Sequence, residues 1–137
     1  MSRILLDTNL LIYSIDKDSK YFEKANSFFS EPKHELFTSS KNLSEFLAVM
    51  TRLPKAPISL EDALMVIEDF KGLLTVLYPT EKSYSIFLNL LQKYRPTGLQ
   101  IHDFEIISIG LANSINKVAT FNKKDFEKVR ELEIYSF

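Results

Sequence analysis

Three acidic residues that lie far apart in the sequence are the strongest candidates for chemistry: Asp7, Glu45 and Asp103. Carboxylate oxygens bind hard divalent cations, and carboxyl groups also act as general acids or bases. Carboxylates brought to one place repel one another, so either their pKa values rise or a divalent cation neutralises them. The set therefore points to a metal site if the surrounding strands and helices bring the three acids together.

Asp7 directly follows the short apolar run Ile4-Leu5-Leu6, which is typical of a strand buried on both faces. In open α/β sheets, ligands bind beyond the carboxyl ends of the strands, and Asp7 is expected at such an end. Asp is also a common N-cap, and the helix expected to follow gives Asp7 this second interpretation. Both interpretations stay open at this point.

Glu45 lies opposite the buried stripe of a helix expected over residues 41–51. Ala48 and Val49 share its side, so this helix is apolar nearly all round. We expect the Glu45 carboxylate to be partly enclosed and to need a partner, which a cation would supply. The alternative is an ordinary solvated glutamate.

Asp103 begins an apolar helix expected over residues 103–116. An acid in the first turn of a helix complements the helix dipole, which is the alternative role for this residue. Gly110, on the same face, would let another backbone or a ligand approach closely. His102 fits a cap, a phosphate contact or an ordinary surface position.

The elements that must position these acids alternate between strand and helix. Further strands are expected at residues 35–39, 73–77, 118–120 and 134–135, and further helices after residue 9 and at residues 21–30, 59–71, 80–94 and 125–130. No Asn-Gly or Asp-Gly hairpin turn interrupts the alternation, so the pattern predicts one α/β domain with a parallel sheet. Residues 59–94 fit either sheet crossovers or an inserted helical pair.

The composition is that of one globular domain, with 137 residues of which 45% are hydrophobic and 26% charged. No apolar run approaches the roughly 20 residues that cross a bilayer, and the N-terminal segment is unlike a signal peptide. We expect a cytoplasmic protein without membrane contact. The absence of cysteine excludes a cysteine zinc site and favours oxygen-bound Mg²⁺ or Mn²⁺.

The formal net charge is −1, so no overall positive field indicates a polyanionic partner. Any nucleic-acid site must therefore be local. The basic residues that qualify are Lys17, Lys20 and Lys24, then Lys41, Arg52 and Lys55, and finally Lys117, Lys123 and Lys124. Each group fits an ordinary solvated surface at least as well.

Several segments together resemble the PIN-domain family, and within it the VapC-like toxins, over nearly the whole chain. They are Asp7-Thr8-Asn9, Ser44-Glu45-Phe46, Asp103 at the start of a helix, and Ala-Thr-Phe-Asn-Lys-Lys-Asp-Phe at residues 119–126. The resemblance implies a Rossmann-like α/β/α sandwich over residues 1–137 with a central parallel sheet. It also implies an acidic pocket for Mg²⁺ or Mn²⁺ and endonucleolytic hydrolysis of RNA by metal-activated water.

The resemblance also assigns roles to residues. Asp7, Glu45 and Asp103 carry over as catalytic and metal-binding acids. Asn122 stands where many family members have aspartate, which leaves Asp125 as the candidate fourth catalytic acid and puts a complete second metal site in doubt. Four residues next to these acids are expected to orient the pocket: Thr8, Asn9, Thr120 and Asn122.

A VapC-like protein implies an antitoxin partner that wraps the toxin, and a toxin homodimer. The apolar helices at residues 21–29 and 46–50 offer contact surface for either partner, or else belong to the core. Other interpretations are a free-standing RNA-processing nuclease and a catalytically weak PIN-like module that binds RNA or protein. A phosphohydrolase of the haloacid-dehalogenase kind normally needs Asp-x-Asp, and here the third residue is Asn9.

Overall fold

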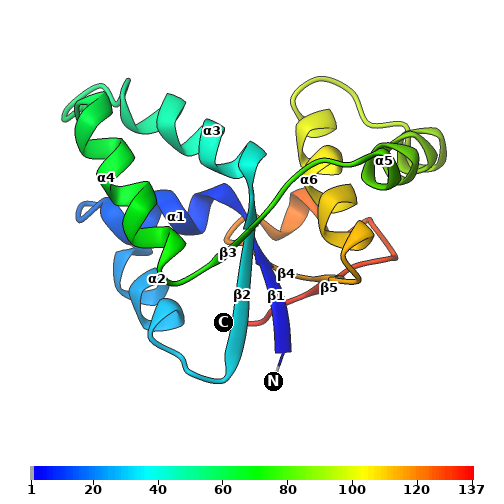
Figure 1. Cartoon of the computed structure of the whole chain (residues 1–137), viewed down its shortest axis with the longest axis horizontal. Coiled ribbons are helices and arrows are strands. Elements are labelled where there is room, and N and C mark those ends of the chain that lie inside the picture. Colours follow the sequence, from blue (N-terminus) through cyan, green and yellow to red (C-terminus); the bar gives the residue numbers. More distant parts are fainter. Residues whose placement is uncertain (1) are drawn as a thin grey trace.

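The apolar run at residues 4–6 lies at the centre of a parallel sheet in the computed structural model of the chain, which describes residues 2–137 (Figure 1). The strands are β1 (Ser2–Leu6), β2 (His34–Ser39), β3 (Thr75–Leu77), β4 (Lys117–Ala119) and β5 (Glu133–Ile134). Their order in the sheet is β3-β2-β1-β4-β5, and each neighbouring pair is parallel. The predicted parallel α/β domain is confirmed.

Helices cover both faces of this sheet. They are α1 (Thr8–Ile15), α2 (Phe22–Phe29), α3 (Ser40–Met50), α4 (Leu60–Lys71), α5 (Glu81–Tyr94), α6 (Gln100–Ala112) and the 3₁₀ helix η1 (Lys123–Asp125). Ile4 and Leu6 are buried in a core with α1 to α4, whereas Leu5 is buried in a second core with α5 and α6. Figure 1 shows the two helix groups on opposite sides of the strands, so the domain is an α/β/α sandwich.

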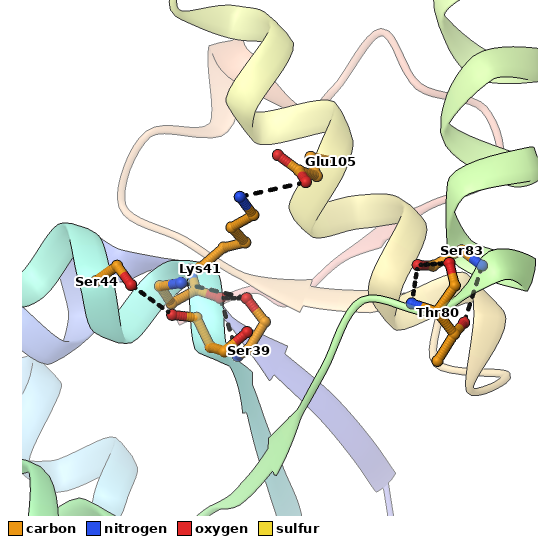
Figure 2. A network of polar contacts seen from close by, with 8 residues as sticks. Ser39, Lys41, Ser44, Thr80, Ser83 and Glu105 are labelled. Carbon is orange, nitrogen blue, oxygen red and sulfur yellow. Dashed lines mark hydrogen bonds and ion pairs between the residues drawn. The ribbon is translucent and has the colours of Figure 1, made fainter.

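Polar caps fix where three of the helices begin. At α3 the Ser39 hydroxyl accepts from Asn42 N, and Asn42 Oδ1 accepts from Ser39 N. Thr80 and Ser83 form the same reciprocal pair at α5, which Figure 2 shows, and Ser59 caps α4. Such a cap stabilises a helix by about 1 kcal/mol.

Two expectations about the helices need adjustment. α6 begins at Gln100, earlier than expected, because Gly98 turns the chain with a φ of 63° and its carbonyl accepts the hydrogen bond from Ile101 N at 3.2 Å. This backbone start needs no side-chain cap and so gives no cap signal. Residues 59–94 are not an inserted helical pair, since β3 separates α4 from α5 and pairs in parallel with β2.

The prediction of a short helix over residues 125–130 is wrong. Only the 3₁₀ helix η1 forms, and it ends at Asp125. Phe126 and Val129 still reach the second core, but they do so from consecutive turns. The spacing between Phe126 and Val129 is also that of one helical turn. The apolar pattern alone therefore did not distinguish a helix from these turns, which explains the wrong prediction.

The strand order changes direction between β1 and β4. From β1 the chain continues to β2 and β3 on one side, and then crosses to β4 and β5 on the other. Ligands of open parallel sheets bind at such a switch point, beyond the carboxyl ends of the two strands. Here those ends lead into Asp7 and Thr120. Within residues 2–137, no helix has both the length and the apolar character to span a bilayer.

Candidate active site

Asp7 lies at the carboxyl end of β1 and also caps α1. Its backbone N donates to Ala119 O at 2.9 Å, which ties it to the end of β4. Its carboxylate accepts hydrogen bonds from Thr8 N and from Thr120 Oγ1, both at 2.8 Å. Asp7 can be a helix cap and also lie at the ligand-binding end of the strands. One carboxylate oxygen accepts from the helix, and the other faces the end of β4.

The Thr120 hydroxyl links Asp7 to the turn after β4. Thr120 is fully buried, and its Oγ1 accepts from Asn122 N at 2.9 Å and from Asn9 Nδ2 at 3.4 Å. Asn122 Nδ2 in turn donates to Asp125 Oδ2 at 2.6 Å. Asn122 holds the Asp125 carboxylate, which lies close enough to Asp7 for its charge to contribute to the raised pKa of Asp7.

Asn42 is a residue of this site that no sequence motif indicated. Its side chain is fully buried, and Nδ2 donates to Thr8 Oγ1 at 2.9 Å while Oδ1 completes the cap with Ser39. Asn42 thus fastens the start of α3, which carries Glu45, to the residue that follows Asp7. The Ser39-x-x-Asn42 spacing signals the cap, but no local pattern signals the bond to Thr8.

Glu45 is exposed on α3, so the expectation of a partly enclosed carboxylate is wrong. Ala48, which was expected to share an enclosed face with it, is not buried either. Glu45 lines an open pocket of about 280 Å³ together with Lys41 of α3 and His102 of α6. In Figure 2, Lys41 extends from α3 towards α6, where its Nζ lies 3.5 Å from Glu105 Oε2.

Asp103 lies in the first turn of α6 and is half-buried. The close approach predicted at Gly110 is made by the chain itself, because a Cβ there would lie 2.9 Å from Leu5 Cδ2 and 3.2 Å from Ile115 O. α6 consequently packs tightly against β1. This packing sets the position of Asp103 relative to the strand that ends at Asp7.

Burial and mutual repulsion raise the pKa of two of these acids. The pKa of Asp103 rises to about 7, mainly because of burial and then because of the charges of Asp7, Asp125 and Glu45. The pKa of Asp7 rises to about 6, again mainly because of burial, although the hydrogen bond from Thr120 opposes the rise. Acids that perturb each other's ionisation share one electrostatic environment.

The four acids form a negatively charged region, but their side chains are not arranged as a complete metal site. They are Asp7, Glu45, Asp103 and Asp125. Among residues 2–137, no group of three or more His, Asp or Glu side chains already converges closely enough to hold a metal ion. In the same part of the chain, none of the four acids forms an ion pair with a basic residue. The acids that β1, α3, α6 and η1 bring together therefore have no ion-pair partner among the described residues.

Comparison with known proteins identifies similar chains. The sequence profile of the family described as PIN domain matches residues 4–132. None of the curated proteins matches the sequence. A chain in the structure of DNA-bound VapBC from Salmonella typhimurium is 26% identical, with a TM-score of 0.68 and 98% of each chain covered.

Two further solved structures share the fold at lower identity. Mycobacterium tuberculosis VapC20, described as a toxin that cleaves the sarcin-ricin loop, is 13% identical with a TM-score of 0.72, and the match covers 92% of this chain and 95% of that one. A toxin-antitoxin complex from Klebsiella pneumoniae contains a chain that is 15% identical with a TM-score of 0.68, covering 97% of this chain and 96% of that one.

Proposed function

The chain belongs to the PIN-domain family, and we propose that it is a metal-dependent endoribonuclease that serves as the toxin of a toxin-antitoxin pair. One observation carries the proposal. Four acids from distant parts of the sequence share one electrostatic environment at the switch point of a parallel sheet, as the mutual effects on the pKa values of Asp7 and Asp103 indicate. The family match makes nuclease chemistry the first expectation for such a region and leaves no support for a haloacid-dehalogenase type of phosphohydrolase.

The donor set fits a hard divalent cation. Carboxylate oxygens are the ligands that Mg²⁺ and Mn²⁺ prefer. The raised pKa values of Asp7 and Asp103 mean that their negative charges lack compensation, which a cation would provide. We assign Asp7, Glu45 and Asp103 as the residues that would hold it, with Asp125 as the fourth acid. When bound, the cation supplies Lewis-acid charge for the scissile phosphate and favours ionisation of water at neutral pH.

The protein's own groups supply orientation. Thr8 N and Thr120 Oγ1 each occupy one oxygen of Asp7, so the carboxylate is held at a fixed angle to the crevice. Asn42 holds α3, and hence Glu45, against the same loop. In this scheme a water molecule attacks the phosphate in line with the leaving 3′ oxygen, which gives products with 5′-phosphate and 3′-hydroxyl ends.

The solved structures support the biological part of the proposal. VapC20 is described as a toxin that cleaves the sarcin-ricin loop, and the Klebsiella pneumoniae structure as a toxin-antitoxin complex. By analogy we propose RNA as the substrate, an antitoxin as the partner and a homodimer as the assembly. The alternative is a binding module without catalytic activity, because within residues 2–137 the acidic side chains do not converge closely enough to hold a metal ion.

The test is induced expression of the wild type, Asp7→Asn and Asp18→Asn in a bacterium, with growth recorded and RNA 5′ ends sequenced. Asp18 is an exposed acid of the loop after α1 and serves as the matched control. We expect growth arrest and discrete new 5′-phosphate ends with the wild type and with Asp18→Asn only. New ends without growth arrest would favour a free-standing nuclease. Equal numbers of new ends with Asp7→Asn, or none with the wild type, would contradict the enzymatic proposal.

A further inference from the structure

A pocket of about 530 Å³ opens beside the acidic site, between α2 and the turn that follows β4. It is distinct from the pocket that contains Glu45. Its lining combines aromatic rings and lysines: Tyr21, Phe121 and Phe137 with Lys24, Lys123 and Lys124. The remaining lining residues, Thr120 and Asn122, belong to the hydrogen-bonded turn that orients Asp7. A molecule in this pocket would therefore lie next to the turn that orients Asp7.

The aromatic wall is a continuous stack of rings. Phe121 stacks on Tyr21 with ring centroids 4.5 Å apart and an interplanar angle of 17°. Phe137 stacks on Phe121 as well, at 4.5 Å and 20°. Tyr13 supports Tyr21 with ring centroids 5.2 Å apart. Because Phe121 lies between Tyr21 and Phe137, both of its faces are covered, and the exposed ring of the wall is Phe137, which is 41% exposed.

The lysines make this pocket a local exception to the negative net charge. Lys24 on α2 and Lys123 and Lys124 in η1 are all exposed. Within residues 2–137, none of the three forms an ion pair with an acidic side chain. The fold thus brings together two of the basic groups that are separate in the sequence. Exposed cations without partners are available for an anionic ligand.

We propose that this pocket binds one nucleotide of single-stranded RNA next to the scissile phosphate, with the base against the aromatic wall and the backbone phosphate at the lysines. Aromatic platforms combined with a basic groove are the usual means by which proteins bind single strands without reading sequence. The exposed ring of Phe137 favours a planar base over an acidic peptide, which would need only the lysines. The inference rests on the proposed ribonuclease function and adds the place where substrate binds beside the acids.

The experiment measures binding and not cleavage, so that its outcome is independent of the enzymatic test. Fluorescein-labelled oligouridylate is titrated with full-length Asp7→Asn protein across a series of KCl concentrations, and anisotropy gives the Kd. The test variants in this background are Phe137→Leu, which removes the exposed ring, and Lys123→Gln with Lys124→Gln. Phe137→Tyr keeps an aromatic ring, and Lys55→Gln with Lys82→Gln is the matched control, because these lysines are exposed but outside the pocket.

We expect Phe137→Leu to weaken binding about tenfold, the size of losing one stacked base, and Phe137→Tyr to keep it. The double variant of Lys123 and Lys124 should weaken binding at low salt and flatten the dependence of log Kd on log salt by about 0.7 for each phosphate that the lysines no longer neutralise. Circular dichroism shows whether each variant is folded. For a variant that fails to fold, cross-linking of 4-thiouridine RNA to the Tyr21 or Phe121 peptide of the Asp7→Asn protein is the substitute measurement.

Any of four results would overturn the inference. The first is that the pocket variants bind RNA as well as the control variant does. The second is that the folded Asp7→Asn protein binds no RNA at low salt, and the third is that cross-links map elsewhere. The fourth is that the pocket variants lose binding of an oligoglutamate peptide but keep binding of RNA, which would assign the pocket to a protein partner. Wild-type cleavage with unchanged binding in the pocket variants would leave the proposed function standing and remove only this subsite.

Discussion

In the absence of metal, Asp7→Asn should make the protein more stable at neutral pH. The pKa of Asp7 is raised from 3.8 to about 6. Each pKa unit corresponds to about 1.4 kcal/mol, so ionised Asp7 lowers the free energy of unfolding by about 3 kcal/mol. The substitution also removes the carboxylate that accepts from Thr120 Oγ1, a loss of about 1 kcal/mol. The net gain of about 2 kcal/mol corresponds to a Tm higher by about 8 °C for a domain of this size.

The gain must depend on pH in a defined direction. The folded protein keeps the proton of Asp7 up to a pKa of about 6, whereas the unfolded chain releases it near 3.8. The wild type therefore has the full contribution below the unfolded pKa and loses it as the pH rises through the folded pKa. The difference in Tm between Asp7→Asn and the wild type should be small at the acidic end and reach its full size above neutrality.

The assay is thermal unfolding of both proteins in EDTA over a pH series, with Asp18→Asn as the control for loss of an exposed negative charge. The control should follow the wild type at every pH. The reasoning is refuted if Asp7→Asn is no more stable than the wild type at neutral pH, or if its advantage is the same at acidic and neutral pH. In either case the pKa of Asp7 would not be raised in the folded protein, and the electrostatic argument for a cation would lose its main support.

Further predictions concern the same region. Mg²⁺ or Mn²⁺ should raise the Tm of the wild type and do so much less for Asp103→Asn, and equal rises in a thermal shift assay would count against Asp103 as a ligand. Asn42→Ala should lower the free energy of unfolding by about 2 kcal/mol, because it leaves the Thr8 hydroxyl buried without its donor. It should also reduce RNA cleavage by more than the loss of folded protein explains. Urea unfolding measures the first effect, and single-turnover cleavage measures the second. Gly110→Ala should destabilise by about 1 to 3 kcal/mol, since the new Cβ would press on Leu5, and an unchanged urea midpoint would show that α6 can move away. Thr120→Val should raise the pKa of Asp7 further by removing its strongest hydrogen-bond donor, which NMR titration of the carboxyl carbon detects.

Features of the fold that depend on neighbouring residues could be predicted from the sequence. The run Ile4-Leu5-Leu6 has no polar side chain to place on a solvent face, so a central strand is the one location that suits it. Ser59 and Thr80 cap helices within their own turn, and the sequence contains both partners of each bond. The order of these elements then leaves a parallel sheet, and the position of Asp7 at a strand end follows.

The parts that the sequence did not reveal depend on which distant elements meet. The bond from Asn42 to Thr8 joins α3 to α1, and nothing near either residue announces it. Glu45 is exposed because α3 packs through one stripe only, which the apolar neighbours of Glu45 obscured. The pocket at Tyr21 and Lys124 likewise exists only after α2 and η1 are placed side by side.

The pairing of β1 with β4 has a consequence for synthesis of the protein. The bond between Thr120 and Asp7 closes over 113 positions, and the Asp125 carboxylate comes later still in the chain. Until β4 has been synthesised, the chain lacks the strand that completes the acidic region. Contacts of such long sequence separation also form slowly. The acidic region can therefore form only after almost all of residues 2–137 have been synthesised.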